Sequence, residues 1–441
     1  MRWLLYPVLV VLTSFYIFPI TFYFFPIANT KMVMAVLGVV TFIIDSILTR
    51  KSVMSSKVMT AGICAFAVSF WGIVSVLYNG TNDYNYASYF VSFCVWIAAA
   101  YFVISCIRWV HGYVSVQIVC NYLIAVTLSQ CFLAIALDLL PTFKAIINDL
   151  VVGFASMYSA GDGLEKAGRL YGIGAALDVA GTRFCAVLCI IGIMAFNSFR
   201  FKRNGILIIY VLSMIILLVV GSMISRTTGV GVIVLILYYV VTSQRGDKSF
   251  FLQLISICLI LTVVCIILYN SSPFFYDNLR FAFEGFFNLF ETGHWRLQST
   301  DALREMYIFP DSLKTWLIGD GYFEEPYTTD PYYVGEIRNW GLFYMGTDVG
   351  YIRFIYYFGC LGMLSFMFYF IRIAKDCAKD FPRDKWVFYS MLLINFIIWL
   401  KVATDIFCLF ALFLCILKEE TNDSQQQLLM GNTLDGIKKD F

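Results

Sequence analysis

The chain has 441 residues, of which 60% are hydrophobic, 18% are aromatic and only 14% are charged. Soluble globular proteins carry about 25% charged residues, so this composition excludes a soluble enzyme. The 31 lysines and arginines nearly balance the 29 aspartates and glutamates, and a net charge of +2 offers no basic surface for nucleic acid. Apolar runs of about 20 residues recur along the chain and predict an all-α polytopic membrane protein.

The first predicted span, at 3–25, is longer than the apolar core of a signal peptide and is not followed by a cleavage site. The run 386–417 is expected to cross twice around Lys401, which gives about twelve spans in all. The span at 228–243 and this last pair are short, so tilted, broken or re-entrant helices remain open there. The other spans are expected at 31–48, 58–78, 87–107, 114–137, 173–197, 205–223, 250–270 and 348–371.

Lysine and arginine are concentrated in the short loops on one side of these spans. The positive-inside rule therefore places both termini in the cytoplasm, with a cytoplasmic tail at 419–441. The transmembrane part is expected to comprise 1–270, which holds nine spans and an outer loop at 138–172, and 348–418, which holds three spans. The large outer loop at 271–347 separates the two.

This large outer loop is expected to be partly helical. From Leu279 to Glu291 polar residues recur every three or four positions among phenylalanines, which predicts an amphipathic helix lying on the membrane surface. A second helix is expected from His294 to Ile308, before Pro310, and aromatic-rich turns follow. The Gly-x-Gly at 318–322 lacks the strand-to-helix context of a nucleotide-binding fingerprint.

Thirteen cysteines are present, and neither long outer loop contains one. Their placement argues against a disulfide framework and against a cysteine-ligated zinc site. The only two histidines, His111 and His294, are too few for a multi-histidine metal site. We therefore expect no metal.

Charged residues that interrupt the spans gather near the outer boundary. They are Arg169, Asp178, Arg183, Arg226, Asp348, Arg353, Lys401 and Asp405. A charge near hydrocarbon costs several kcal/mol, so each needs compensation. Lys401 and Asp405, four residues apart, are expected to form a structural ion pair. The spacing of Asp178 and Arg183 is poor for a direct pair, so both require partners on other helices.

The remaining arginines favour an anion site. Arginine stays charged and offers planar, bidentate donors that match phosphate. The four arginines of this group outnumber its aspartates Asp178 and Asp348, so internal pairing cannot satisfy all of them. A phosphate or pyrophosphate at the level of the lipid headgroups is the ligand that this excess predicts.

Polar motifs mark the ends of several spans, and a long outer loop precedes a late span. The motifs are Arg-Leu-Tyr-Gly-Ile-Gly-Ala-Ala-Leu-Asp-Val-Ala-Gly (169–181), Ser-Arg-Thr-Thr-Gly (225–229), Leu-Ile-Gly-Asp-Gly-Tyr (317–322) and Asp-Val-Gly-Tyr-Ile-Arg-Phe-Ile-Tyr-Tyr-Phe-Gly-Cys-Leu-Gly (348–362), with Thr-Lys-Met-Val-Met-Ala-Val-Leu-Gly (30–38) entering the second span. In order and placement they resemble the O-antigen and capsular polysaccharide polymerases of the Wzy class, relatives of the O-antigen ligases. The resemblance covers most of the chain.

The resemblance implies a GT-C-like membrane glycosyltransferase at the outer face of a bacterial inner membrane, working without nucleotide sugar, metal or other cofactor. The donor is a glycan on undecaprenyl pyrophosphate, the acceptor is a sugar hydroxyl on another lipid-linked repeat unit, and undecaprenyl pyrophosphate is released. Membrane lipids, a chain-length regulator and a flippase of the same pathway are the other implied partners. By motif position, Arg169 and Arg226 match the arginines that hold the pyrophosphate.

One departure separates the two related families. Ligases carry a histidine just before the late span, whereas this sequence has Asp348 there, which favours the polymerase. Asp348 is expected either to act as the base that activates the acceptor or to cap the helix that follows. Arg353 is expected to be a third phosphate contact or the partner of Asp348, and Tyr351 is expected to pack or to contact substrate.

Several residues of the large outer loop are candidate sugar or phosphate contacts. They are His294, Arg296, Arg304 and Arg338, with Trp295, Trp316 and Trp340 as rings that either stack on sugars or anchor the loop.

Two rival functions stay open. A transporter or flippase for the same glycan predicts ionisable residues near the membrane midplane and two related halves, neither of which the sequence displays. A mannosyltransferase that uses a polyprenyl-phosphate sugar requires acidic residues in its first outer loop, and the short loop 26–30 has none.

Overall fold

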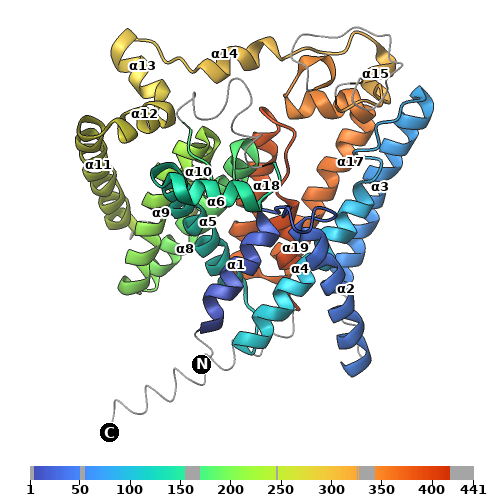
Figure 1. The fold of residues 1–441 in the computed structure, drawn as a ribbon, viewed down its shortest axis with the longest axis horizontal. Helices are drawn as coiled ribbons and strands as arrows, with labels where there is room; N and C mark the ends of the chain where they lie inside the picture. The colour runs from blue at the N-terminus through green and yellow to red at the C-terminus, as the bar shows by residue number, and fades with distance from the viewer. Residues whose placement is uncertain are drawn as a thin grey trace.

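The structure is a computed structural model that describes residues 4–49, 55–153, 169–244, 247–324, 326 and 343–417. Within these ranges the regular structure is helical, and the β contacts are isolated bridges. Eight helices are long and apolar enough to cross a membrane, so the chain is a polytopic membrane protein (Figure 1). These helices are α2 (Thr30–Thr49), α3 (Ser56–Asn79), α4 (Tyr89–His111), α5 (Val116–Leu139), α8 (Leu177–Arg200), α9 (Asn204–Ile224), α11 (Lys248–Ser271) and α17 (Gly350–Asp380).

Shorter helices occupy the other predicted spans. They are α1 (Leu5–Ile17), α10 (Val230–Thr242), α18 (Lys385–Ile398) and α19 (Phe407–Leu414). The span predicted at 3–25 is too long, since α1 ends at Ile17 and Phe18 leaves the helical conformation with φ −119° and ψ 78°. Phe18 precedes Pro19, and the residue before a proline is disfavoured in an α-helix. The other three short helices lie where short spans were expected.

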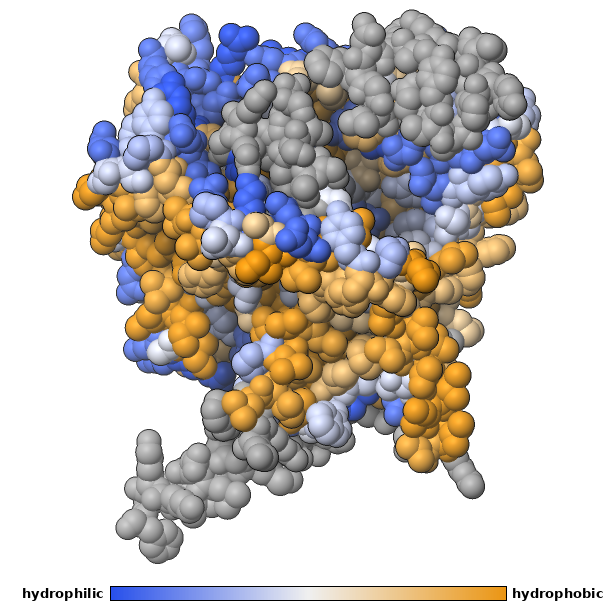
Figure 2. Space-filling model, in the orientation of Figure 1, coloured by the Kyte–Doolittle hydropathy of each residue, from blue (hydrophilic) through white to orange (hydrophobic). Residues whose placement is uncertain are grey.

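Four helices of the large outer loop lie across one end of the bundle, which we call the loop face (top of Figure 1). They are α12 (Pro273–Ala282), α13 (Glu284–Thr292), α14 (Gln298–Glu305) and α15 (Leu313–Leu317). Of the other long loop, 138–172, the structure describes α6 (Pro141–Leu150). Figure 2 shows an apolar belt below the hydrophilic loop face, as expected for a membrane-embedded bundle.

The helix predicted at 279–291 is in fact two helices. Phe283, with φ −116° and ψ 28°, separates α12 from α13. The break places Glu284 at the start of α13, where its carboxylate accepts the backbone N–H of Gln298 at 3.1 Å. The spacing of polar residues shows which residues of one helix share a face, but it does not report a contact with a residue beyond that helix. The periodicity therefore could not predict the break. The helix predicted at 294–308 is shortened to α14.

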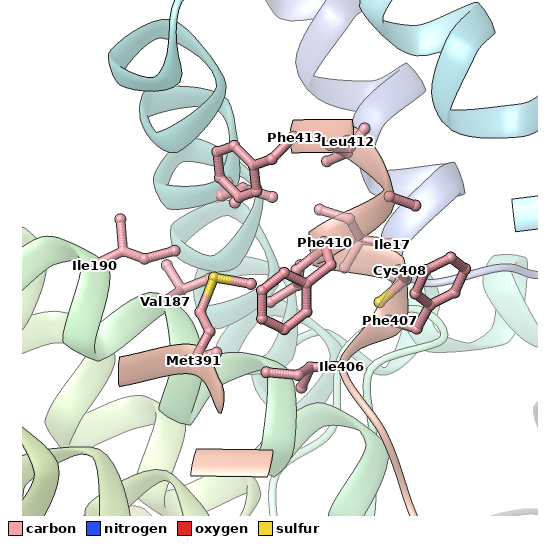
Figure 3. Close-up of a cluster of buried hydrophobic side chains, with 14 of the residues drawn as sticks. Ile17, Val187, Ile190, Met391, Ile406, Phe407, Cys408, Phe410, Leu412 and Phe413 are labelled. Carbon is pink, nitrogen blue, oxygen red and sulfur yellow. The ribbon is translucent and has the colours of Figure 1, made fainter. Parts of the chain in front are cut away.

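The centre of the bundle is built on α8 and α19. In the most apolar stretch of α8, 89% of the residues are buried, whereas in that of α11 none is buried. Helix α8 is therefore enclosed by protein, and α11 is exposed. All eight residues of α19 are buried. Figure 3 shows members of α19, among them Phe407, Phe410 and Phe413, near side chains of α1, α8 and α18. Lys57 on α3 caps the end of α19, donating to the carbonyls of Phe413 at 3.2 Å and Ile416 at 2.9 Å.

The large outer loop is anchored on a break in α17. Gly359 has φ +69°, a left-handed conformation that favours glycine, and it interrupts the helix. The Gly-x-Gly segment packs against this break, because the N–H groups of Asp320 and Gly321 donate to the carbonyls of Tyr356 at 2.6 Å and Tyr357 at 3.1 Å. The Gly-x-Gly segment is thus a backbone anchor between the loop and α17.

We predict that Gly359→Ala destabilises the fold by at least about 2 kcal/mol. A methyl group at Gly359 would lie 2.2 Å from the carbonyl oxygen of Leu317, in addition to the cost of the left-handed backbone. The measurement is the thermal midpoint of the purified protein in detergent. Gly205→Ala is the matched control, because a methyl group there meets no atom within 4 Å. Equal midpoints for the two variants would contradict the prediction.

Candidate functional site

Two arginines share one aromatic ring at the loop face. Arg169 precedes α8, and Arg226 opens η2 (Arg226–Gly229), the turn between α9 and α10. The guanidinium carbons of Arg169 and Arg226 lie 4.6 Å and 4.4 Å from the ring centroid of Phe281 on α12. Each cation gains from the ring, but the two repel each other, so the pair is favourable only with negative charge nearby.

Glu284 forms a direct ion pair with Arg226. Its Oε2 accepts a hydrogen bond from Nη1 of Arg226, and the two side chains are 24% and 17% exposed. Arg169 has no acidic partner among the described residues, and its buried Nε has no hydrogen-bond acceptor. Burial and the neighbouring charge of Arg226 lower the pKa of Arg169 from its usual value. Arg169 is therefore a charged group with unused donors.

A second ionic group includes Thr227, which follows Arg226 in the sequence. Lys401 donates through Nζ to Oδ1 of Asp178 at 2.8 Å and to Oγ1 of Thr227 at 3.1 Å. The predicted ion pair between Lys401 and Asp405 is wrong. Because α18 ends at Ile398 and the turn that follows is not helical, a spacing of four does not bring these two side chains together. The expectation that Asp178 needs a partner from another element is confirmed.

A third group surrounds Arg353 on α17. Its side chain is buried between the rings of Phe323 and Phe343, with centroids 3.6 Å and 4.0 Å from the guanidinium carbon. It donates to the carbonyl of Phe323 at 2.9 Å and to Oε1 of Glu324 at 3.4 Å. Nη1 of Arg353 lies 3.6 Å from Oδ1 of Asp348, so Arg353 is a partner of Asp348, as one alternative predicted.

Asp348 lies directly before α17 and does not cap it. Val349 is the N-cap residue, and the helix start has no side-chain cap. Burial raises the pKa of Asp348 to about 7, and the charge of Arg353 opposes this rise. Smaller effects come from Asp178, which raises the pKa, and from Lys401, which lowers it, so the second and third groups are close enough to act on each other. At neutral pH this carboxyl group therefore exists in both protonation states.

Sequence reasoning missed two carboxylates of the site, Glu284 and Glu324. Glu284 belonged to a predicted surface helix and Glu324 to a loop of turns, and no spacing in the sequence links either one to Arg226 or Arg353. Once both are included, the arginines no longer outnumber the carboxylates. Arg169 is the arginine of the Phe281 pair that has no acidic partner among the described residues.

Two further candidate residues contact backbone carbonyls and aromatic rings. The hydroxyl of Tyr351 donates to the carbonyl of Phe396 at 3.0 Å, and its ring packs edge-on against Trp399. Arg183 finds partners on another element, as expected. Its Nη1 donates to the carbonyl of Ile17, and its guanidinium lies over the ring of Phe18 at 5.3 Å.

Four candidate residues of the large outer loop line a separate cavity. His294, Trp295, Arg296 and Arg304 line a space of about 330 Å³ where α13 passes into α14. Arg296 is 74% exposed and bonds to Asp301 at 2.6 Å. Their predicted role in binding sugar or phosphate stays a prediction. Arg338 and Trp340 lie outside the described residues, and Trp316 donates to the carbonyl of Pro310 at 2.8 Å.

The chemistry available at the site is that of anion binding and proton transfer. Over the described ranges, no group of three or more His, Cys, Asp or Glu side chains is placed to hold a metal ion, and all thirteen cysteines are free thiols. Arg169 offers unused donors to an anion, and Asp348 offers a carboxyl group that exchanges a proton near neutral pH.

We predict that Glu284→Gln lowers the free energy of unfolding by about 1–2 kcal/mol, since it leaves the partly buried Arg226 without its charge partner. The matched control is Glu291→Gln, also on α13, which breaks the exposed pair with Arg280 of α12 and is expected to cost about 0–1 kcal/mol. Chemical denaturation in detergent compares the two variants. A loss for Glu284→Gln no larger than for Glu291→Gln would show that this pair does not anchor the loop.

Comparison of the chain with protein-family models, with curated proteins and with solved structures finds no match.

Proposed function

We propose that the chain is a GT-C-like membrane glycosyltransferase that polymerises oligosaccharide repeat units carried on undecaprenyl pyrophosphate. The product is an O-antigen or capsular polysaccharide, and undecaprenyl pyrophosphate is released. The observation that carries the proposal is the pair Arg169 and Arg226 around Phe281, in which Arg169 has no acidic partner among the described residues. A pyrophosphate supplies the negative charge that Arg169 lacks.

In the proposed reaction, Asp348 activates the acceptor, and Arg169 and Arg226 stabilise the leaving group. The acceptor hydroxyl attacks the anomeric carbon of the donor sugar, and its proton passes to the carboxylate of Asp348. The bond between the anomeric carbon and the pyrophosphate oxygen breaks, and the electron pair leaves with the pyrophosphate. Arg169 and Arg226 stabilise the negative charge that develops there. Asp348, with a pKa of about 7, suits a base that works near neutral pH.

The proposed location is the inner membrane of a bacterium, with both termini in the cytoplasm and the loop face outside. The excess of lysine and arginine in the short loops of the opposite side supports this orientation. The lipid-linked oligosaccharide, membrane lipids, a chain-length regulator and a flippase of the same pathway are the proposed partners.

An O-antigen ligase is the second candidate function, since it uses the same donor and transfers the glycan to lipid A core. Asp348 in place of the ligase histidine favours the polymerase. A transporter of the same lipid-linked glycan is less well supported, because Arg169, Arg226 and Asp348 lie at the ends of helices, where α12 and its neighbours cross the loop face, rather than at mid-helix.

The test uses the full-length protein in detergent or liposomes with lipid-linked oligosaccharide extracted from cells that lack the gene. A ladder of products of increasing length, absent when the protein is omitted, is the expected result. Single transfer to added lipid A core would favour the ligase. Movement of the lipid across liposomes without any new glycosidic bond would favour the transporter, and either outcome contradicts the proposal.

A further inference from the structure

A second, smaller cavity lies beside the pair formed by Lys401 and Asp178. It has a volume of about 200 Å³ and is lined by Trp96 from α4, Arg183 from α8, Thr404 and Asp405 from the turn after α18, and Cys408 from α19. Oγ1 of Thr404 is 3.0 Å from Oγ1 of Thr182, which in turn donates to the carbonyl of Asp178 at 2.6 Å. Hydrogen bonds thus connect the wall of the cavity to Asp178 of the site at the loop face.

Charged side chains of both signs lie around this cavity. Nζ of Lys31 lies 4.4 Å from the ring centroid of Trp96, the aromatic wall. Within the part of the chain that the structure describes, neither Lys31 nor Arg183 forms an ion pair with Asp405. Asp405 uses Oδ1 to accept the N–H of Phe407 at 2.8 Å, which leaves Oδ2 for another donor. Arg183 gives one N–H to the carbonyl of Ile17 and keeps others.

The lining decides the chemical class of the ligand. An apolar ligand would leave these charges without hydrogen-bonding partners. A simple anion is repelled by Asp405, and a metal cation is repelled by Lys31 and Arg183. A sugar ring offers hydroxyl donors to the carboxylate, hydroxyl acceptors to the cations and a C–H face to the indole of Trp96. The volume is below the roughly 300 Å³ at which pockets for drug-sized ligands begin, so it suits a single ring.

We propose that this cavity binds the terminal sugar of the acceptor glycan, separately from the arginines that hold the donor pyrophosphate. This inference rests on the proposed function, and it assigns the two substrates to two different parts of the site. Arg169 and Arg226 bind the leaving group, whereas Asp405, Arg183 and Trp96 position the sugar that carries the attacking hydroxyl.

The experiment separates the acceptor from the donor chemically. Mild acid releases the oligosaccharide from its lipid pyrophosphate, and the released oligosaccharide can accept a glycan but cannot donate one. The variant is Asp405→Asn, because asparagine keeps the volume and can still accept the N–H of Phe407 while the charge is lost. We expect the KM for the released oligosaccharide to rise at least about tenfold and the KM for the lipid-linked donor to stay unchanged.

The matched control is Asp277→Asn on an exposed position of α12, for which both KM values are expected to equal those of the unmodified protein. If Asp405→Asn unfolds at a lower temperature than Asp277→Asn, then Trp96→Phe replaces it. Phenylalanine keeps a ring in the cavity wall and is also expected to raise only the KM of the acceptor.

Calorimetric titration with the released oligosaccharide distinguishes failure of the inference from failure of the proposed function. If polymer forms and Asp405→Asn changes neither the acceptor KM nor the binding, the inference is wrong and the function stands. If no polymer forms but the oligosaccharide binds and Asp405→Asn abolishes the binding, the cavity is a sugar site and the polymerase proposal fails.

Discussion

Arg169→Lys is expected to reduce the rate of polymerisation about 100-fold at saturating lipid-linked substrate. Lysine keeps the positive charge but loses the planar pair of donors that a pyrophosphate oxygen pair engages. The loss falls on kcat, since charge on the leaving group is greatest as the glycosyl bond breaks. The Nε of Arg169 is buried and has no hydrogen-bond acceptor among the described residues, so the substitution breaks no hydrogen bond of that atom. The folded protein should therefore be as stable as before.

The matched control for this prediction is Arg280→Lys. Arg280 also lies at the loop face and over an aromatic ring, that of Phe287 at 5.8 Å, but it is already bonded to Glu291 at 2.8 Å. Its replacement is expected to leave the rate within twofold of the original. Product length and yield on a gel, with single-turnover rates, provide the measurement. A similar decrease for both variants would mean that the loss is not specific to Arg169 and would contradict the prediction.

Asp348→Asn is expected to lower kcat/KM by about 100-fold to 10,000-fold and to remove the acid limb of the pH profile. Activity is expected to fall at low pH, because a base works only when it is deprotonated. The pKa of Asp348 is raised to about 7, so activity rises as the pH increases towards 7 and levels off above it. Below pH 7 the unmodified protein should lose about tenfold in kcat/KM for each pH unit. The measurement is the initial rate between pH 5 and pH 9.

The substitution Glu324→Gln tests whether Asp348 acts as a base or only as an ion-pair partner of Arg353. Both carboxylates pair with Arg353, and the charge of Glu324 raises the pKa of Asp348. Without that charge the acid limb is expected to move to lower pH, while the plateau rate is retained. If Asp348 served only to neutralise Arg353, the two substitutions would have the same effect on the plateau.

Hydropathy alone predicted the positions of the helices well, because a run of apolar residues is a local signal. Each predicted span contains a helix, from α1 to α19. The ends of elements were less predictable. Pro19 cut short the span predicted at 3–25, and a single carboxylate, Glu284, accompanies the division of one predicted amphipathic helix into α12 and α13.

Six charged residues of the candidate site were identified from the sequence, but Glu284, Glu324 and the pairing of the charges were not. Arg169, Asp178, Arg226, Asp348, Arg353 and Lys401 were identified because a charge at the edge of a span is rare. Which side chain meets which depends on how distant elements pack. Lys401 pairs with Asp178, 223 positions away, and Arg226 pairs with Glu284, 58 positions away. Spacing along one helix therefore gave the wrong partner for Lys401.

The short helix α19 determines how the site responds to the surrounding lipid. Its eight residues are far fewer than the about 20 that a bilayer requires, and all of them are buried. Side chains of the protein hydrogen-bond to the backbone at both ends of α19. Asn395 and Asp405 accept N–H groups at its start, and Lys57 donates to a carbonyl at its end. Mismatch between a helix and the bilayer acts only on helices that touch lipid, such as α11. A thinner or thicker membrane would thus change the tilt of the helices that touch lipid. The turn that carries Lys401 and Asp405 would keep its position relative to the buried helices.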